Sequence, residues 1–195
     1  MILAGLVYSS ISNSTAVVHL AAQVSVPLSV ENPEETMEIN VQGTQNVIDS
    51  CLENGVTRLV VASSAAVYGE AETLPLKEEA AGDLLSPYAE SKWANEQQII
   101  EARSNGLQAS CLRFFNVYGP RQDSTNQYSG VISIFINRLM QNKPVIVNGG
   151  YQTRDFIFVD DIVKVMDRSM KHLLKKESCD SCGEQTGQSS TQQGF

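Results

Sequence analysis

The sequence predicts an α/β fold built on part of a doubly wound parallel sheet, with helices on both faces of the sheet. Two observations predict it. Apolar strand-like segments alternate with helix-like segments along the chain, and the strand-like segments are uninterrupted apolar runs. Because helices cover both faces of a parallel sheet, both sides of each strand are buried and carry apolar residues. An antiparallel sheet with one wet face would alternate apolar and polar residues instead.

The elements before residue 56 include one predicted strand and one predicted helix. Residues 1–8 are apolar, and we interpret them as a strand or a frayed end; they lack the basic flank of a secretion signal. Residues 16–20 form a short apolar run that predicts a buried strand. Asn32-Pro33 predicts the start of a helix, and Asn54-Gly55 predicts its end.

The central part of the chain gives the clearest pattern. Residues 58–63 predict a second buried strand that ends in the small-residue turn Ser64-Ala65-Ala66. Ser86-Pro87 predicts the next helix start, because serine caps a helix well and proline fits its first turn. That helix is expected to end near Asn105-Gly106, and residues 107–114 predict a third strand.

The remaining residues predict shorter elements and a tail. We expect a helix at 131–141, short strands at 145–147 and 156–159, and a helix that begins at Asp160-Asp161 and runs through Leu174. Residues 176–195 are rich in Ser, Gln, Gly and Thr and carry no apolar period, which predicts a disordered tail. The folded domain is therefore expected to cover residues 1–175.

Composition narrows the possible partners. The length of 195 residues suffices for one domain with its own core, and the formal net charge of -8 argues against a nucleic-acid-binding surface. No apolar run is long enough for a membrane span. Cys51 and Cys111 lie in apolar segments, whereas Cys179 and Cys182 form a lone C-x-x-C without the second pair of ligands that structural zinc needs. We expect no metal and a reducing, cytoplasmic setting.

Tyr88 and Lys92 are the first candidates for chemistry. They lie four residues apart on the predicted helix and therefore share a face. A free tyrosine titrates near about 10, and a neighbouring ammonium lowers that pKa by stabilising the phenolate. Ser64 ends a buried strand, at the edge of a parallel sheet where ligands bind. Taken alone, the pair is also a common chance spacing, and Ser64 also suits a plain turn residue.

Six segments together carry a specific resemblance. Residues 61–69 (VASSAAVYG) and 86–92 (SPYAESK) hold the three candidate residues, and residues 19–23, 40–44, 113–121 and 152–161 follow in a matching order. As a set they resemble the extended short-chain dehydrogenases/reductases, specifically the NAD-dependent nucleotide-sugar epimerase/dehydratase family, with its Rossmann-like fold. The resemblance covers roughly residues 16–170.

The resemblance implies a role for each matching residue. Ser64, Tyr88 and Lys92 take the catalytic positions, and NAD is the implied cofactor, with Lys92 also bonding its nicotinamide ribose. The implied cofactor-binding residues are Ala21, Ala22, Asn40, Ser63, Tyr88 and Lys92. The implied substrate-binding residues are Ser64, Asn116, Val131, Val147 and Arg154, which would hold a nucleotide-linked sugar. From the residues alone, a surface ion pair explains Arg154 and core packing explains both valines equally well.

The turn after Ser64 favours one branch of the family. The family's 4,6-dehydratases carry an acidic pair in that turn, and its sugar-acid decarboxylases carry a glutamate there. Here the turn holds Ala65 and Ala66, whose methyl groups cannot transfer protons. The resemblance therefore points to epimerisation at C4 of a UDP-hexose through a 4-keto sugar. A dehydratase or reductase of the same family stays an alternative.

One expected feature is missing. None of the thirteen glycines forms the G-x-x-G-x-x-G loop that cradles the pyrophosphate of NAD in this family. We therefore expect a partial sheet that lacks the family's first strands and most of its substrate lobe, with residues 16–20 at an edge. Two hypotheses follow: an active NAD-dependent epimerase, or a non-catalytic fragment of one. In either case the resemblance implies that a homodimer would use the helices that contain Tyr88 and begin near Glu34.

Overall fold

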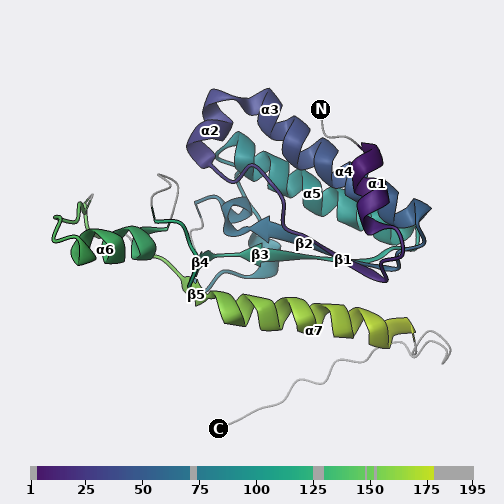
Figure 1. Cartoon of the computed structure of the whole chain (residues 1–195). Coiled ribbons are helices and arrows are strands. Elements are labelled where there is room, and N and C mark those ends of the chain that lie inside the picture. Colours follow the sequence, from purple (N-terminus) through teal and green to yellow (C-terminus); the bar gives the residue numbers. More distant parts are fainter. Residues whose placement is uncertain (1–3, 71–73, 125–129, 148, 152, 178–195) are drawn as a thin grey trace, which may run out of the picture.

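The computed structural model describes residues 4–70, 74–124, 130–147, 149–151 and 153–177. Helices and strands alternate over much of this range (Figure 1). The strands are β1 (Ala16–His19), β2 (Arg58–Ser64), β3 (Gln108–Phe114), β4 (Asn116–Tyr118) and β5 (Phe156–Phe158). The α-helices are α1 (Ala4–Ile11), α2 (Val26–Glu31), α3 (Pro33–Met37), α4 (Gly43–Glu53), α5 (Pro87–Ser104), α6 (Val131–Met140) and α7 (Val159–Glu177). A π-helical segment, η1 (Glu38–Gln42), joins α3 to α4, and the short 3-10 turns η2 (Ala65–Tyr68) and η3 (Glu78–Ala80) follow β2.

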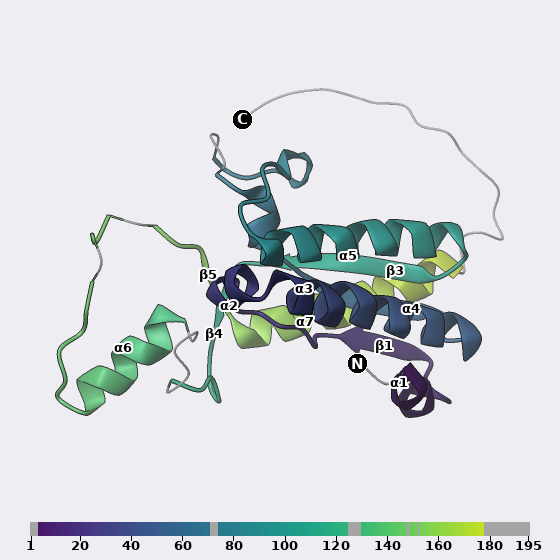
Figure 2. The same cartoon turned by 90° about the horizontal axis from the view of Figure 1, so that it is seen from above.

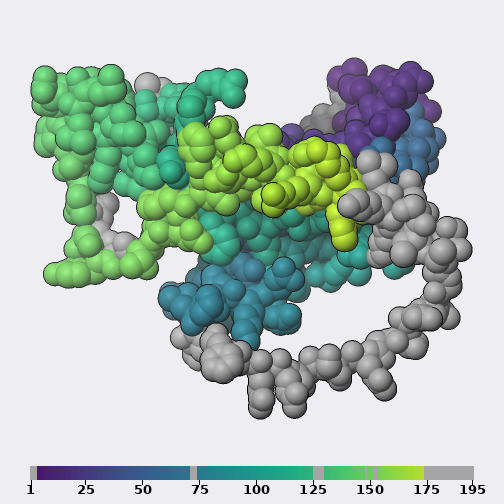
Figure 3. All heavy atoms as spheres, turned by 90° about the horizontal axis from the view of Figure 1, so that it is seen from below, coloured from purple at the N-terminus to yellow at the C-terminus, as the bar shows by residue number. Residues whose placement is uncertain are grey.

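The main sheet confirms the predicted fold class. Its strands run parallel in the order β1-β2-β3, with Val17 opposite Leu59 and Val61 opposite Cys111. Helices α1 to α5 lie on one face and α7 lies on the other (Figure 1). The view from below shows α7 crossing that second face as a ridge (Figure 3). Within the described part of the chain, β1 is an edge strand of this sheet, as expected.

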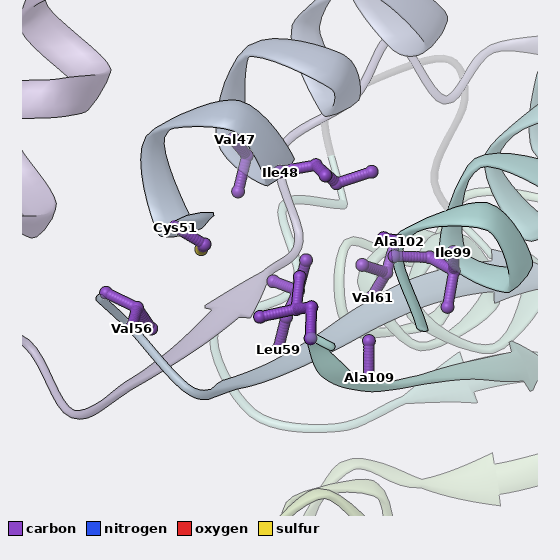
Figure 4. Close-up of a cluster of buried hydrophobic side chains, with 10 residues drawn as sticks. Val47, Ile48, Cys51, Val56, Leu59, Val61, Ile99, Ala102 and Ala109 are labelled. Carbon is purple, nitrogen blue, oxygen red and sulfur yellow. The ribbon is translucent and has the colours of Figure 1, made fainter. Parts of the chain in front are cut away.

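The apolar runs of the sequence form the core between the sheet and the upper helices. Leu59 and Val61 of β2 are almost fully buried and pack against side chains of α4 and α5 (Figure 4). The cluster contains Val47, Ile48, Cys51, Val56, Leu59, Val61, Ile99, Ala102, Leu107 and Ala109. Burial of this size stabilises the sheet by about 25 cal/mol for each Å² of apolar surface. The core therefore fixes β2 against α5, the two elements that carry the candidate residues.

Two predictions were wrong, the strand or frayed end at residues 1–8 and the strand at residues 145–147. Residues 4–11 form helix α1 instead, whose Val7 and Ile11 pack against the core cluster. A short apolar run does not distinguish helix from strand, and here the helix places two apolar side chains on the core. Residues 145–147 form no strand; Ile146 and Val147 are exposed, without a partner strand among the described residues.

The structure also contains elements that the sequence did not suggest. Strand β4 pairs in parallel with β5 to form a second, two-stranded sheet. Helix α2 begins at Ser25, whose Oγ accepts a hydrogen bond from the Leu28 amide. Helix α6, by contrast, confirms the helix predicted at residues 131–141; it stands apart from the main sheet beyond β4 and β5, as the view from above shows (Figure 2).

The remaining predictions concern the C-terminal tail, membrane-spanning helices and metal sites. Helix α7 ends at Glu177, slightly beyond its predicted end, while the rest of the predicted tail lies outside the described residues, together with Cys179 and Cys182. Within the described ranges, no helix is long and apolar enough to cross a membrane. The same residues contain no cluster of His, Cys, Asp and Glu side chains suited to a metal ion.

Candidate active site

Helix α5 presents Tyr88 and Lys92 toward the end of β2. Ser86 caps the helix, with its Oγ accepting a hydrogen bond of 3.1 Å from the Ala89 amide, and Pro87 occupies the first turn. This cap fixes where the helix begins, so that Tyr88 lies in the first turn and Lys92 one turn further on. Both side chains are buried, with 9% and 5% of their surfaces exposed.

Lys92 is attached to β2 directly. Its Nζ donates a hydrogen bond of 3.0 Å to the carbonyl oxygen of Ala62 and lies 5.9 Å from the centre of the Tyr88 ring. Burial lowers the pKa of Lys92, because a cation loses its hydration there. The same ammonium contributes, after burial, to the lowered pKa of His19.

The hydroxyl of Ser64 lies close enough to Tyr88 to affect the pKa of its phenol. Ser64 ends β2, and its Oγ also accepts a hydrogen bond of 3.2 Å from the Ala66 amide at the start of η2. Burial raises the pKa of Tyr88, and the neighbouring Ser64 hydroxyl acts in the opposite direction. The expected lowering of this pKa was wrong for the chain by itself, because loss of hydration outweighs the favourable contact.

One cavity of about 430 Å³ unites the three predicted catalytic residues. Ser64, Tyr88 and Lys92 line it together, with Ala62 and Ser63 of β2 beside them. The rest of its wall is apolar: Leu20, Val24, Phe114, Phe115, Val117, Val159, Ile162, Val163 and Met166. An apolar cavity with a few convergent polar groups is typical of a small-molecule site.

The predicted cofactor residues fall into two groups. Ala21 and Ala22 line a second cavity, of about 550 Å³, next to His19 and Gly43. Asn40, by contrast, is 1% exposed, and its side-chain amide forms hydrogen bonds with the backbone of Gln23 and the hydroxyl of Ser91. It therefore holds the loop after β1 against α5.

Ser63 has both kinds of environment. It borders the catalytic cavity, yet its side chain is 3% exposed and its Oγ donates a hydrogen bond to the carboxylate of Glu96. Its hydroxyl is thus used inside the protein. A cofactor role for Ser63 or Asn40 stays a prediction.

The predicted substrate residues, apart from Ser64, lie elsewhere. Asn116 begins β4, and its Nδ2 donates a hydrogen bond of 3.0 Å to the carbonyl oxygen of Asp155. Asp155 directly follows Arg154 in the sequence. Arg154 is exposed and donates to the carbonyl oxygen of Thr153. Neither residue lines the cavity of Tyr88.

Val131 and Val147 are not core residues. Their exposed fractions are 41% and 60%, so the core-packing alternative was wrong for both. Val131 begins α6, whose next turns line a cavity of about 350 Å³ together with Tyr118 and Phe158. A role for either valine in holding a base stays a prediction.

Sequence reasoning missed a charged pair beside the site. Glu96 and Arg113 form an ion pair of 2.7 Å, with only 10% and 18% of their side chains exposed. One signal for Glu96 was present: it lies four residues after Lys92 and eight after Tyr88, on the same helix face. Nothing in the sequence indicated that Arg113 of β3 would reach it.

Comparison with known proteins gives a consistent family. The family model for the NAD dependent epimerase/dehydratase family matches residues 7–180. A putative UDP-glucose 4-epimerase of Methanocaldococcus jannaschii is 44% identical over 151 residues, which is 76% of this chain and 49% of that protein. A UDP-glucuronate 4-epimerase of Thermodesulfobacterium geofontis is 37% identical over 164 residues, 82% of this chain and 49% of that protein. The chain spans about half the length of the curated relatives it matches.

Solved structures agree with the fold. The UDP-N-acetylglucosamine 4-epimerase from Methanobrevibacter ruminantium, in complex with UDP-N-acetylmuramic acid, has a TM-score of 0.80 and 37% identity over 85% of this chain and 54% of that one. The UDP-glucose 4-epimerase of Thermus thermophilus, in complex with NAD, has a TM-score of 0.78 and 35% identity over 86% of this chain and 57% of that one. The matches also include a decarboxylase from Bacillus cytotoxicus, at 32% identity over 86% of this chain and 53% of that protein.

Proposed function

Because the chain belongs to the NAD-dependent epimerase/dehydratase family, we propose that it carries the proton-transfer site of a UDP-hexose 4-epimerase. The observation that supports this most is the single cavity lined by Ser64, Tyr88 and Lys92. The cavity brings the phenol of Tyr88, the hydroxyl of Ser64 and the ammonium of Lys92 together. These groups can take the proton from a secondary alcohol, while the hydride needs an acceptor such as a bound nicotinamide.

The residues around the site fit NAD. The ammonium of Lys92 has three hydrogens, and the structure records one bond for it, to Ala62, at the wall of the cavity. This leaves donors for the ribose hydroxyls. The small side chains of Ala21 and Ala22 border the neighbouring apolar cavity of about 550 Å³ and leave room for a flat ring. When bound, NAD would accept a hydride from C4 of the sugar and return it.

The proposed role of Tyr88 is to take the proton from the C4 hydroxyl. Ser64, which lines the same cavity as Tyr88, would bind the same sugar oxygen and hold it in line. Lys92 lies 5.9 Å from the Tyr88 ring and would stabilise the phenolate as the proton moves. Return of the hydride to the opposite face of the 4-keto sugar, with the proton returned by Tyr88, would complete the epimerisation.

The turn after Ser64 supports epimerisation over elimination. Ala65 and Ala66 begin η2 directly after the serine, and neither carries a group that can protonate a leaving hydroxyl. Relatives of this chain include a decarboxylase and structures of sugar-nucleotide dehydratases, so the family alone does not choose the reaction. The two alanines support an epimerase over these alternatives.

The contrasting hypothesis is a chain that keeps this site without turning over substrate. It is motivated by the sequence, which holds no G-x-x-G-x-x-G loop for the pyrophosphate. A homodimer through α5 and the α3–α4 helix is a further proposal, which sedimentation of the purified chain would test.

Two measurements on the purified chain separate these hypotheses. Calorimetric titration with NAD reports binding, and conversion of UDP-galactose to UDP-glucose with added NAD reports turnover. Saturable binding together with conversion is the expected result. If binding does not saturate up to about 1 mM NAD, the proposal for this chain is overturned. A dissociation constant of about 1 mM corresponds to a binding free energy of about 4 kcal/mol.

A further inference from the structure

Glu96 continues a stripe of buried polar residues along α5. Tyr88, Lys92 and Glu96 follow one another at intervals of four residues, so that they share the helix face that meets β2. Glu96 is 8% exposed, about as buried as the other two. A carboxylate at this depth loses its hydration and needs partners that replace it.

Three donors surround the Glu96 carboxylate. Its Oε1 accepts hydrogen bonds from Ser63 Oγ at 2.5 Å and from Arg113 Nε at 2.9 Å, and its Oε2 accepts one from Arg113 Nη2 at 2.7 Å. Arg113 is itself fixed on its other sides: Nη1 donates to the carbonyl oxygen of Glu78, and its guanidinium lies 4.9 Å from the centre of the Tyr68 ring. The planar, bidentate geometry leaves the carboxylate one orientation.

These bonds converge on the strand end that carries Ser64. Ser63 and Arg113 are opposite each other in the register of β2 and β3. Lys92 binds the carbonyl of Ala62, and Glu96 binds the side chain of Ser63, so α5 is attached to two successive residues of β2. The next residue is Ser64, whose hydroxyl meets Tyr88.

We propose that Glu96 is a positioning residue: acting through the hydroxyl of Ser63, it fixes the end of β2 against α5 and so sets the contact between Ser64 and Tyr88. Only the catalytic consequence of this inference rests on the proposed function. The contact itself is a property of the folded chain. Stability alone does not require a carboxylate here, because well-packed apolar residues replace many buried ion pairs without loss.

The contact between Ser64 and Tyr88 has a direct readout. The Ser64 hydroxyl opposes the rise in the pKa of Tyr88 that burial causes. If Ser64 drifts away from Tyr88, the pKa of the phenol rises further. Labelling the tyrosines with ¹³C at Cζ gives an NMR signal that follows both the hydrogen bond and the titration, and the spectrum of Tyr88→Phe identifies the signal of Tyr88.

The decisive variant is Ser63→Ala, with Ser110→Ala as its matched control. Ser63→Ala removes the hydroxyl that connects Glu96 to β2 and leaves the ion pair with Arg113 in place. Ser110 lies on the adjacent strand β3, and its buried hydroxyl has no hydrogen-bond partner among the residues that the structure describes. We expect Ser63→Ala to raise the pKa of Tyr88 by about 0.5 unit or more, and Ser110→Ala to leave it unchanged.

A pKa and a neutral-pH Cζ shift of Tyr88 that are the same in both variants would overturn the proposal. If the chain unfolds at a pH below the one at which Tyr88 ionises, the chemical shift of Tyr88 Cζ at neutral pH is compared between the variants instead. If circular dichroism shows that Glu96→Gln folds, we expect it to raise the pKa of Tyr88 as Ser63→Ala does. If Glu96→Gln does not fold, Ser63→Ala alone tests the proposal. None of these measurements needs NAD, sugar or turnover. An inactive chain in which Ser63→Ala shifts Tyr88 would therefore contradict the proposed function alone.

Discussion

The Nζ of Lys92 donates a hydrogen bond of 3.0 Å to the carbonyl oxygen of Ala62. This bond joins the middle of the helix face that carries Tyr88 to the strand end that carries Ser64. It keeps an ammonium group beside a cavity where few other polar groups are available to hold it. The positive charge is therefore held in place before any substrate arrives, which is the arrangement that electrostatic catalysis favours.

Replacing Lys92 by methionine is expected to stabilise the folded chain at neutral pH. Burial lowers the pKa of Lys92, so the folded state holds the cation at a cost that disappears once the amine is neutral. We expect Lys92→Met to be more stable than the parent at neutral pH by about 1 kcal/mol, measured by urea unfolding. The advantage should shrink as the pH rises from the lowered pKa of Lys92 toward 10.5, its ordinary value.

Lys164→Met on α7 is the control for this change. Lys164 is exposed and forms a surface ion pair with Asp161, so its loss should leave no comparable pH-dependent gain. Equal pH dependence in the two variants would show that the cost of burying Lys92 is not the cause.

Asn40 should be among the residues most sensitive to substitution. Its amide accepts from the Gln23 amide at 2.8 Å and donates to the Gln23 carbonyl at 3.0 Å and to Ser91 Oγ at 2.9 Å. Asn40→Ala leaves these buried groups without partners, at an expected cost of about 3 kcal/mol in the free energy of unfolding. Asn46→Ala, which removes one exposed bond with Gln42, should cost less than about 0.5 kcal/mol. Similar losses in urea unfolding would refute the role given to Asn40.

Burial of Cys51 is expected to lower the free energy of unfolding as the pH rises into the alkaline range. Its side chain is fully buried, and burial raises the pKa of its thiol from 9.0 to about 11. Because the folded state resists ionisation, the stability linked to this group is complete below pH 9.0 and is lost as the pH rises through about 11. The stability linked to this shift is at most about 3 kcal/mol.

Cys51→Ala tests this linkage. Between pH 9 and pH 11 the free energy of unfolding of the variant should fall less steeply than that of the parent, by up to the same amount. In the native parent at pH 8, mass spectrometry after treatment with a thiol reagent should find Cys51 unmodified. Parallel stability curves, or rapid labelling of Cys51, would contradict its burial.

The turn after Ser64 depends on Gly69. Its φ is +57°, and a Cβ added there would lie 2.1 Å from the carbonyl oxygen of Asp83. Gly69→Ala should therefore cost about 3 kcal/mol or more. Gly55 has a similar φ of +67° but nothing within 4 Å, so Gly55→Ala should cost only about 1 kcal/mol of backbone strain. Equal shifts in the thermal midpoint would mean that the contact with Asp83 is relieved.

The sequence predicted those parts of the fold whose signals are local. Strand β2 and helix α5 were found within one or two residues, because a long apolar run and a Ser-Pro cap specify them without help from the rest of the chain. Helix α1 was mistaken for a strand because eight apolar residues fit both periods, and the packing of Val7 and Ile11 decides between them.

The site was predictable only where its residues follow one helix face or one strand end. Ser64, Tyr88 and Lys92 were recognised from motifs, and the structure brings them into one cavity. Arg113 meets Glu96 because β3 pairs with β2 in one particular register, with Arg113 opposite Ser63. Register depends on tertiary packing, so no local pattern revealed that pair.

The most direct test of the proton-transfer site is the rate at which UDP-galactose is converted to UDP-glucose by three forms of the chain with saturating NAD. The forms are the parent, Tyr88→Phe and, as the matched control, Tyr151→Phe, whose side chain is 95% exposed. We expect Tyr151→Phe to match the parent and Tyr88→Phe to be slower by about 10²- to 10⁴-fold, the usual contribution of a positioned acid–base group. Turnover by Tyr88→Phe at the rate of the parent would contradict the role proposed for Tyr88.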